Sequence, residues 1–157
     1  MTIKAELTIR PLQPGDRGAV VALDALLTGI AKEPYWKHVL DRFLGEEGHI
    51  GLAATVEGEL DGYLFGEPRA FEFGSEECGW IFALGVRPDT TRKGVASALV
   101  AEARRRFRLL GMNRIRTMVR RTDVPFLSLF RGQGFVGGPF VQLELDIAGD
   151  ANAEEKA

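Results

Sequence analysis

The apolar run Trp80-Ile81-Phe82-Ala83-Leu84, followed by a turn and a long amphipathic helix, is the feature that most constrains the fold. The run predicts a buried strand, which Pro88-Asp89 ends because proline removes a ladder donor and favours a turn. Beyond the turn, apolar side chains recur three or four residues apart, which predicts a helix that stops at Gly111. These side chains belong to Val95, Leu99, Ala103, Phe107 and Leu110. The alternation from Arg114 to Val119 predicts a strand parallel to the first, and hence a right-handed β-α-β unit.

The turn between this strand and this helix is suited to binding phosphate. The first amides of a helix have no partner within the helix and lie at the positive end of its dipole. Gly94 lets a ligand approach the backbone closely, and Ala96 adds almost no bulk. Arg92 and Lys93 supply positive charge. The alternative interpretation is an ordinary strand-turn-helix with a solvated basic end, because a lone glycine pattern is weak.

The remaining sequence predicts a succession of short strands and helices. Further strands are expected over 5–12, 50–56, 60–65 and 141–147, and the strand that contains the apolar run is expected to begin near Glu77 or Cys78. Helices are expected between Asp16 and Gly29, over 34–44 and over 124–131, with Asp16 and Asp123 as caps. The apolar stripe of the first helix is expected to include Val20, Ala22 or Leu23, and Leu26 or Leu27. The closing strand is predicted by the alternation of Val141, Leu143, Leu145 and Ile147 with polar residues.

Composition excludes several classes of protein. The 157 residues suffice for one domain with its own core, and a net charge of -2 gives no global attraction to nucleic acid or to an anionic membrane. The single cysteine, Cys78, has no partner for an internal disulfide and is expected to be a small buried residue. His38 and His49 lack metal-ligand spacing, so no metal is expected. No signal peptide and no run long enough to span a bilayer is recognised, which indicates a cytoplasmic protein.

Two motifs in the second half resemble those of the GCN5-related N-acetyltransferase (GNAT) family. The segment Thr91-Arg92-Lys93-Gly94-Val95-Ala96 is similar to the family fingerprint Gln/Arg-x-x-Gly-x-Gly/Ala, with Thr91 as a departure at the first position. The segment from Asp123 to Phe135 resembles the second family motif, a short helix that ends in an aromatic residue and is followed by Gly-Phe. Two motifs in the right order are more specific than either alone.

The resemblance implies a fold and a cosubstrate. The fold would be a single α+β domain over residues 1–147, with a mostly antiparallel mixed sheet, a parallel strand pair at the acetyl-CoA cleft and about four helices. Residues 148–157 are expected to form a disordered tail. In the family, the turn that is here Arg92 to Ala96 wraps the pyrophosphate of acetyl-CoA, and the preceding strand, here Leu84-Gly85-Val86, pairs with the pantetheine arm.

The family's catalytic side chains are replaced in this sequence. Many members use a tyrosine to protonate the departing thiolate, and Phe130 stands at that position, where it can only pack against the cofactor. The base of the histone-modifying branch falls on Trp80. Asp123, Glu76 and Glu77 remain as candidate bases, although Asp123 also suits a helix cap and the glutamates suit a solvated loop. Tyr63 would serve as an acid only if the fold brings its hydroxyl group near the thiol.

Three functions are compatible with these residues. The first is an N-acetyltransferase acting on a primary amine of a small molecule or peptide, and the second is a catalytically weak acyl-CoA-binding or sensing module. The third is a nucleic-acid-associated protein, suggested by the arginines of 104–121 and disfavoured because helical spacing spreads them around the helix. Tyr35-Trp36 could line an acceptor pocket or pack in the core, and the acids of 67–76 could face a cationic acceptor or be solvated. Neither the acceptor nor a homodimer is settled by the sequence.

Overall fold

The computed structural model describes residues 6–45, 47–70, 72–88 and 94–150, and its centre is a five-stranded sheet with strand order β1-β2-β3-β4-β5. Neighbouring strands are antiparallel except for β4 and β5, which are parallel. The strands are β1 (Leu7–Pro11), β2 (Ile50–Val56), β3 (Glu59–Arg69), β4 (Cys78–Val86) and β5 (Ile115–Thr117). The predicted mixed sheet with one parallel pair is therefore confirmed.

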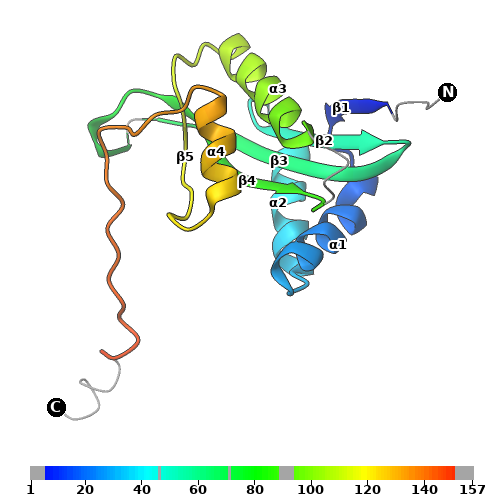
Figure 1. The fold of residues 1–157 in the computed structure, drawn as a ribbon, viewed down its shortest axis with the longest axis horizontal. Helices are drawn as coiled ribbons and strands as arrows, with labels where there is room; N and C mark the ends of the chain where they lie inside the picture. Colours follow the sequence, from blue (N-terminus) through cyan, green and yellow to red (C-terminus); the bar gives the residue numbers. More distant parts are fainter. Residues whose placement is uncertain (1–5, 46, 71, 89–93, 151–157) are drawn as a thin grey trace.

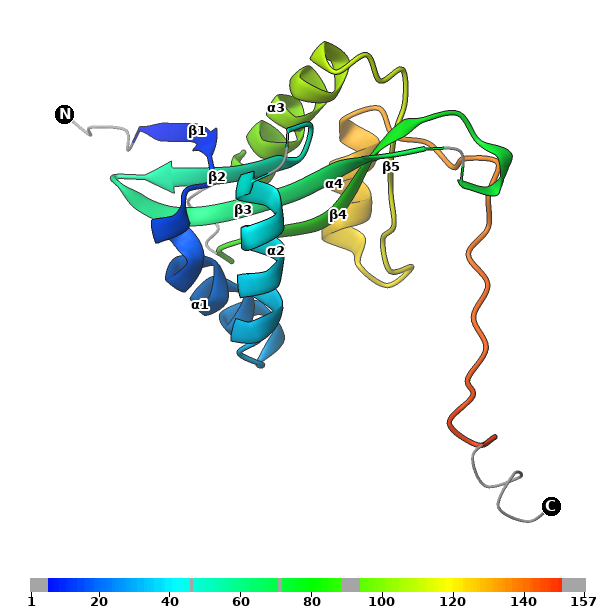
Figure 2. The same ribbon diagram turned by 180° about the vertical axis from the view of Figure 1, so that it is seen from behind.

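Helices cover both faces of the sheet (Figures 1 and 2). One face carries α1 (Arg17–Thr28) and α2 (Glu33–Gly45), and the other carries α3 (Val95–Leu109) and α4 (Val124–Gly132). Two short 3-10 turns, Pro14–Asp16 and Glu72–Gly74, complete the described elements. Each layer has its own apolar core, one centred on Trp36 and Phe65 and the other on Leu99 and Phe107.

Two helices end at the glycines that the sequence predicts. Gly29, with φ 79°, ends α1 and donates its N–H to the Ala25 carbonyl group at 2.8 Å. Gly111 has φ 84° directly after α3, as expected of a residue that ends a helix in the left-handed conformation. Asp16 precedes α1 but caps it with no side-chain hydrogen bond, because its carboxylate instead binds Arg10 and the Gln13 N–H.

The closing strand predicted over 141–147 is wrong. In the described chain this segment pairs with no strand and extends away from the body (Figure 1). The alternation that predicts a strand is present, but the structure supplies no neighbouring strand for it. Of the expected tail, residues 148–150 form a turn, and residues 151–157 lie outside the described residues.

Two other predictions need correction. Strand β3 continues to Arg69, so Glu67 lies in a strand instead of a solvated loop. Its side chain is only 13% exposed, and it forms ion pairs with Arg42 and Arg69, each at 3.3 Å. In α1, Val20 and Leu23 are buried as expected, whereas Leu26 and Leu27 are 59% and 41% exposed.

Phe107 fixes α3 against the sheet at the start of β4. Its ring is fully buried and lies where side chains of Gly66 and Gly79 would otherwise stand. A Cβ atom at Gly79 would come within 2.6 Å of the Phe107 ring. Two glycines on adjacent strands thus form the slot that receives the largest side chain of the helix, and this seating orients α3.

We predict that Gly79→Ala lowers the free energy of unfolding by about 1–3 kcal/mol, because the added methyl group overpacks a slot that has no free volume. The matched control is Gly18→Ala in α1, where no atom lies within 4 Å of the new methyl group. This control should be neutral or stabilising by up to about 1 kcal/mol, since alanine favours the helix. Urea unfolding of both variants measures the difference, and equal stability would contradict the proposed slot.

Candidate functional site

The parallel strands β4 and β5 separate partway along β4. They pair only at Gly79, Trp80 and Ile81, and at the last of these positions Thr117 Oγ1 donates to the Ile81 carbonyl group at 2.9 Å. Beyond it, the edge of 82–86 that faces β5 has no strand partner in the described residues. Backbone groups on that edge can therefore bind an extended ligand as a strand would.

The start of α3 follows directly on this open strand. Gly94 has φ 98°, a left-handed conformation, and its carbonyl group accepts the first helical hydrogen bond from Ala98 at 2.9 Å. The amides of Val95 and Ala96 precede that bond and have no partner within the helix. Arg92 and Lys93, the predicted basic residues of the turn, lie outside the described residues.

Helix α4 carries the two predicted site residues of the second motif. Asp123 Oδ1 accepts the Phe126 N–H at 3.2 Å, so the predicted N-cap is confirmed. The ring of Phe130 is 5% exposed and packs beside Phe126 and Phe135, with ring centroids 6.4 Å and 5.0 Å away. Phe130 thus belongs mainly to the core under α4, and only a small part of its ring is accessible.

The fold does not bring Glu77 together with the end of β4. Glu76 and Glu77 are exposed and directly precede Cys78, the first residue of the strand. An extended chain rises about 3.3 Å per residue, which places Glu77 roughly 30 Å from Val86. Leu84, Gly85 and Val86 therefore lie at the opposite end of the strand from this candidate base.

Tyr63 packs against β4 on the face of the sheet that α1 and α2 cover. It pairs with Gly85 in the β3–β4 register, and a Cβ atom at Gly85 would lie 2.5 Å from its ring. Desolvation, followed by the charge of Asp24 and a hydrogen bond to it, raises the pKa of Tyr63 above its ordinary value. The phenol is therefore protonated at neutral pH, beside the buried Asp24.

Asp24 is a functional candidate that the sequence analysis missed. It lies in α1 among apolar residues, with only 4% of its surface exposed. Trp36 Nε1 donates to Asp24 Oδ2 at 2.9 Å, and Lys32 Nζ lies 3.0 Å from the same oxygen atom. The sequence signal that could have identified Asp24 as buried is its position four residues after Val20, on the apolar face of a helix. Trp36 packs in the core and is only 2% exposed, whereas its neighbour Tyr35 is 47% exposed.

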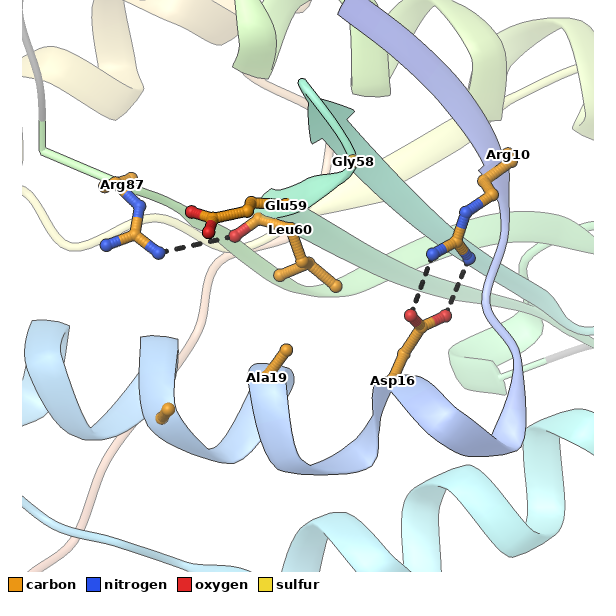
Figure 3. A pocket seen from close by; sticks show the side chains of 8 residues that line it. Arg10, Asp16, Ala19, Gly58, Glu59, Leu60 and Arg87 are labelled. Carbon is orange, nitrogen blue, oxygen red and sulfur yellow. Dashed lines mark hydrogen bonds and ion pairs between the residues drawn. The ribbon is translucent and has the colours of Figure 1, made fainter.

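A cavity of about 310 Å³ lies between α1 and the β2–β3 turn, beside the residue that follows β4 (Figure 3). Two of its charged residues, Arg10 and Asp16, form a bidentate ion pair at 2.7 and 2.8 Å. Arg87 contacts Asp61 through Nε at 3.3 Å and through a backbone hydrogen bond of 2.7 Å. Both guanidinium groups are thus paired within the protein, and the contacts of Arg87 hold the residue that follows β4.

Two absences among the described residues bear on the class of site. No group of three or more His, Cys, Asp and Glu side chains in them is placed to hold a metal ion. Among the helices that they form, none is long and apolar enough to cross a membrane.

We predict that Tyr63 ionises only when the protein unfolds. A raised phenol pKa stabilises the fold at pH values below about 10, and this contribution is lost as the pH rises above that value, because the unfolded phenol then releases its proton. Absorbance at 295 nm should show one tyrosine titrating in the folded protein and the second only with the loss of circular dichroism. Tyr63→Phe should abolish the second step. Two phenols titrating near pH 10 in a folded protein would refute the burial of Tyr63.

Comparisons with known proteins were made for both sequence and structure. The sequence matches the Acetyltransferase (GNAT) family over residues 21–135, and the comparison with curated protein sequences gave no match. The aminoglycoside N-acetyltransferase AAC(6')-Iy in complex with CoA has a TM-score of 0.81 at 15% identity, covering 93% of this chain and 98% of that chain.

Two further solved structures have the same fold. The aminoglycoside antibiotic 6'-N-acetyltransferase AAC(6')-IG from Acinetobacter haemolyticus has a TM-score of 0.74 at 19% identity, covering 88% of this chain and 97% of that chain. The ribosomal-protein-alanine N-acetyltransferase from Brucella melitensis biovar Abortus 2308 has a TM-score of 0.71 at 18% identity, covering 90% and 99%. With a family match over well more than half of its length and a sheet that opens between its parallel strands, this chain belongs to the GNAT family of acetyltransferases.

Proposed function

We propose that the protein transfers an acetyl group from acetyl-CoA to a primary amine of a small molecule or peptide, in the cytoplasm. The observation that carries this proposal is the backbone edge of 82–86, which has no strand partner among the described residues and precedes α3 in the chain. An extended pantetheine arm needs such an edge, and a pyrophosphate needs the unpaired amides of a helix start. The family match and the CoA complex of the AAC(6')-Iy structure support the choice of donor.

The residues that would hold acetyl-CoA follow one another in the chain, from the end of β4 to the start of α3. The pantetheine arm would pair with the backbone of Leu84, Gly85 and Val86, and the pyrophosphate would bind amides from Arg92, Lys93, Gly94, Val95 and Ala96. Val95 is buried in the core at 2% exposure, so its side chain anchors the helix start, and its amide would be available to the pyrophosphate. Phe130 would contribute an apolar contact through the small part of its ring that is accessible.

The proposed chemistry is direct attack of a neutral amine on the thioester. A backbone N–H near Val86 would polarise the carbonyl group, and holding both reactants together would supply up to about 7–11 kcal/mol. The departing thiolate can leave without an acid, because a thiol pKa near 8.5 makes the thiolate accessible close to neutral pH. Phe130 has no proton to donate, and the raised pKa of Tyr63 makes its phenol a weak acid.

Asp123 is the candidate base that we retain. It is partly exposed at the start of α4, and its Oδ1 atom is used by the helix cap, which leaves the second carboxylate oxygen for a water-relayed proton. Glu77 is given no role at the thioester because of its position at the far end of β4. No general acid for the departing thiolate is evident among the candidate side chains. This observation supports a second candidate function, a catalytically weak acyl-CoA-binding module.

A nucleic-acid partner is not part of the proposal. Two arginines of α3, Arg105 and Arg106, form ion pairs with Glu102 at 2.7 and 2.9 Å. Hydrogen bonds from Arg105 and Arg106 lower the pKa of Glu102 to about 2, so its negative charge persists at neutral pH. These arginines are therefore partly neutralised within their own helix.

We predict turnover with an amine panel that includes aminoglycosides, amino acids, polyamines and peptides, measured as thiol release from acetyl-CoA. Aminoglycosides head the panel because two similar structures are aminoglycoside acetyltransferases. At least one amine should raise thiol release well above hydrolysis in buffer. Tight binding of acetyl-CoA with no acceptor accelerating its consumption would instead favour the binding module.

We predict that Gly94→Val weakens acetyl-CoA binding by at least tenfold, because valine is strained at φ 98° and the helix-start amides would be displaced. Gly111→Val is the matched control. It places the same side chain at φ 84° at the opposite end of the same helix, also with no atom within 4 Å. Calorimetry should show loss of affinity only for Gly94→Val, while both variants lose similar stability. An equal affinity of the two folded variants would place the pyrophosphate elsewhere.

A further inference from the structure

A cationic surface lies on one face of the sheet, beside the point where β4 and β5 separate. Trp80 pairs with Arg116 of β5 and with Glu67 of β3, so these three side chains share a face. Glu67 forms an ion pair with Arg42 of α2, which identifies this as the face that α1 and α2 cover. Figure 2 shows α2 over β2 and β3, with the β4–β5 pair beyond it. Trp80 and Arg116 are accordingly only half-buried, and a ligand can reach them.

Arg116 is a positioned cation without a carboxylate partner. In the part of the chain that the structure describes, its guanidinium group forms neither an ion pair nor a hydrogen bond. Its Cζ atom instead lies over the Phe140 ring, 5.1 Å from the ring centroid. A contact between a cation and an aromatic face does not use the N–H donors, so these remain available. A planar guanidinium group in this state is suited to binding a carboxylate through two hydrogen bonds.

The acids on this face are paired with other cations. Glu67 forms ion pairs with Arg42 and Arg69, each at 3.3 Å. His49 Nε2 lies 3.7 Å from the same carboxylate. Glu72 lies 3.9 Å from Arg69. These two carboxylates therefore do not balance the positive charge that Arg116 adds to the face.

The position of Arg116 relative to the reacting amine rests on the proposed function. With the pyrophosphate at the start of α3 and the pantetheine arm along 84–86, the thioester end points back towards the place where the strands separate. A thioester near 82–83 would lie roughly 7–10 Å from Trp80, because an extended strand rises about 3.3 Å per residue. Phe82 lies in between and packs against the core beneath α1 and α2. An amine at the thioester would therefore have Arg116 within reach of its opposite end.

We propose that the acceptor of this acetyltransferase is a primary amine that also carries a carboxylate, and that Arg116 binds this carboxylate. The amine and the carboxylate stand several bonds apart, as the side-chain amine and the carboxylate of lysine do. The methylene groups between them lie along the rings of Trp80 and Phe82. Polyamines and aminoglycosides meet like charge at Arg116 and Arg69, so amino acids and peptides are the better acceptors. Arg116 thus determines specificity and takes no part in acyl transfer.

The first test measures binding in the presence of coenzyme A, which has no acetyl group to transfer. The probes are 6-aminohexanoate and hexylamine, which share the amine and the chain and differ by a carboxylate in place of a methyl group. The protein has 2 tryptophans, so NMR shows two indole N–H signals, and that of the buried Trp36 should not move. The Trp80 signal should report a dissociation constant about ten- to a hundredfold lower for 6-aminohexanoate. Equal affinity for the two probes, or binding of neither, would overturn the proposal.

Variants of Arg116 test whether this residue causes the preference. Arg116→Ala should remove the difference between the two probes, and Arg116→Lys should keep part of it, because the positive charge remains. The matched control is Arg108→Ala, which removes an exposed arginine in the last turn of α3 and should leave the preference unchanged. A preference that survives Arg116→Ala would assign the carboxylate to another residue and refute the proposal.

Turnover separates this inference from the proposed function. Thiol release from acetyl-CoA should show a kcat/KM at least about tenfold higher for lysine than for cadaverine, its decarboxylated analogue. In Arg116→Ala the KM for lysine should rise while kcat stays near its original value, since Arg116 touches no reacting atom. Thiol release with equal kcat/KM for the two amines would refute the carboxylate site alone. Binding of 6-aminohexanoate at Trp80 without thiol release from any amine would support the carboxylate site and count against acetyl transfer.

Discussion

The separation of β4 from β5 after Ile81 exposes backbone groups in the middle of the sheet. Up to that residue the parallel strands pair, and the Thr117 hydroxyl group closes the last position. Beyond it, one edge of β4 has no strand partner in the part of the chain that the structure describes, while β3 still holds the other edge as far as Val86. An extended ligand requires a strand that is held on one side and open on the other. The pairing of β4 supplies both features, so the fold itself forms the proposed site.

The two layers of helices keep that strand in place by different means. On the α3 side, Phe107 fills the slot formed by Gly66 and Gly79, which is a matter of shape alone. On the α1 and α2 side, the buried Asp24 accepts a hydrogen bond from Trp36 and forms an ion pair with Lys32. A buried carboxylate with such partners is costly to disrupt, because removing one partner leaves polar groups unsatisfied.

Sequence reasoning predicted the elements whose signals are local. The strand over 78–86, the helix ended by Gly111 and the Asp123 cap follow from periodicity and from residues with defined backbone preferences. It missed Asp24 because a propensity argument assigns acids to the surface, and only the fold shows which partners reach a given acid. It failed for 141–147 because alternation predicts an extended chain but says nothing of whether a neighbouring strand is available.

The contact between Tyr63 and Gly85 has a consequence for how this sequence can vary. The tyrosine ring occupies the volume in which any side chain at position 85 would stand, on the strand that we propose for the donor. A larger residue at 85 is therefore compatible with this fold only if position 63 becomes smaller at the same time. We therefore expect relatives of this chain to keep both residues or to change both together.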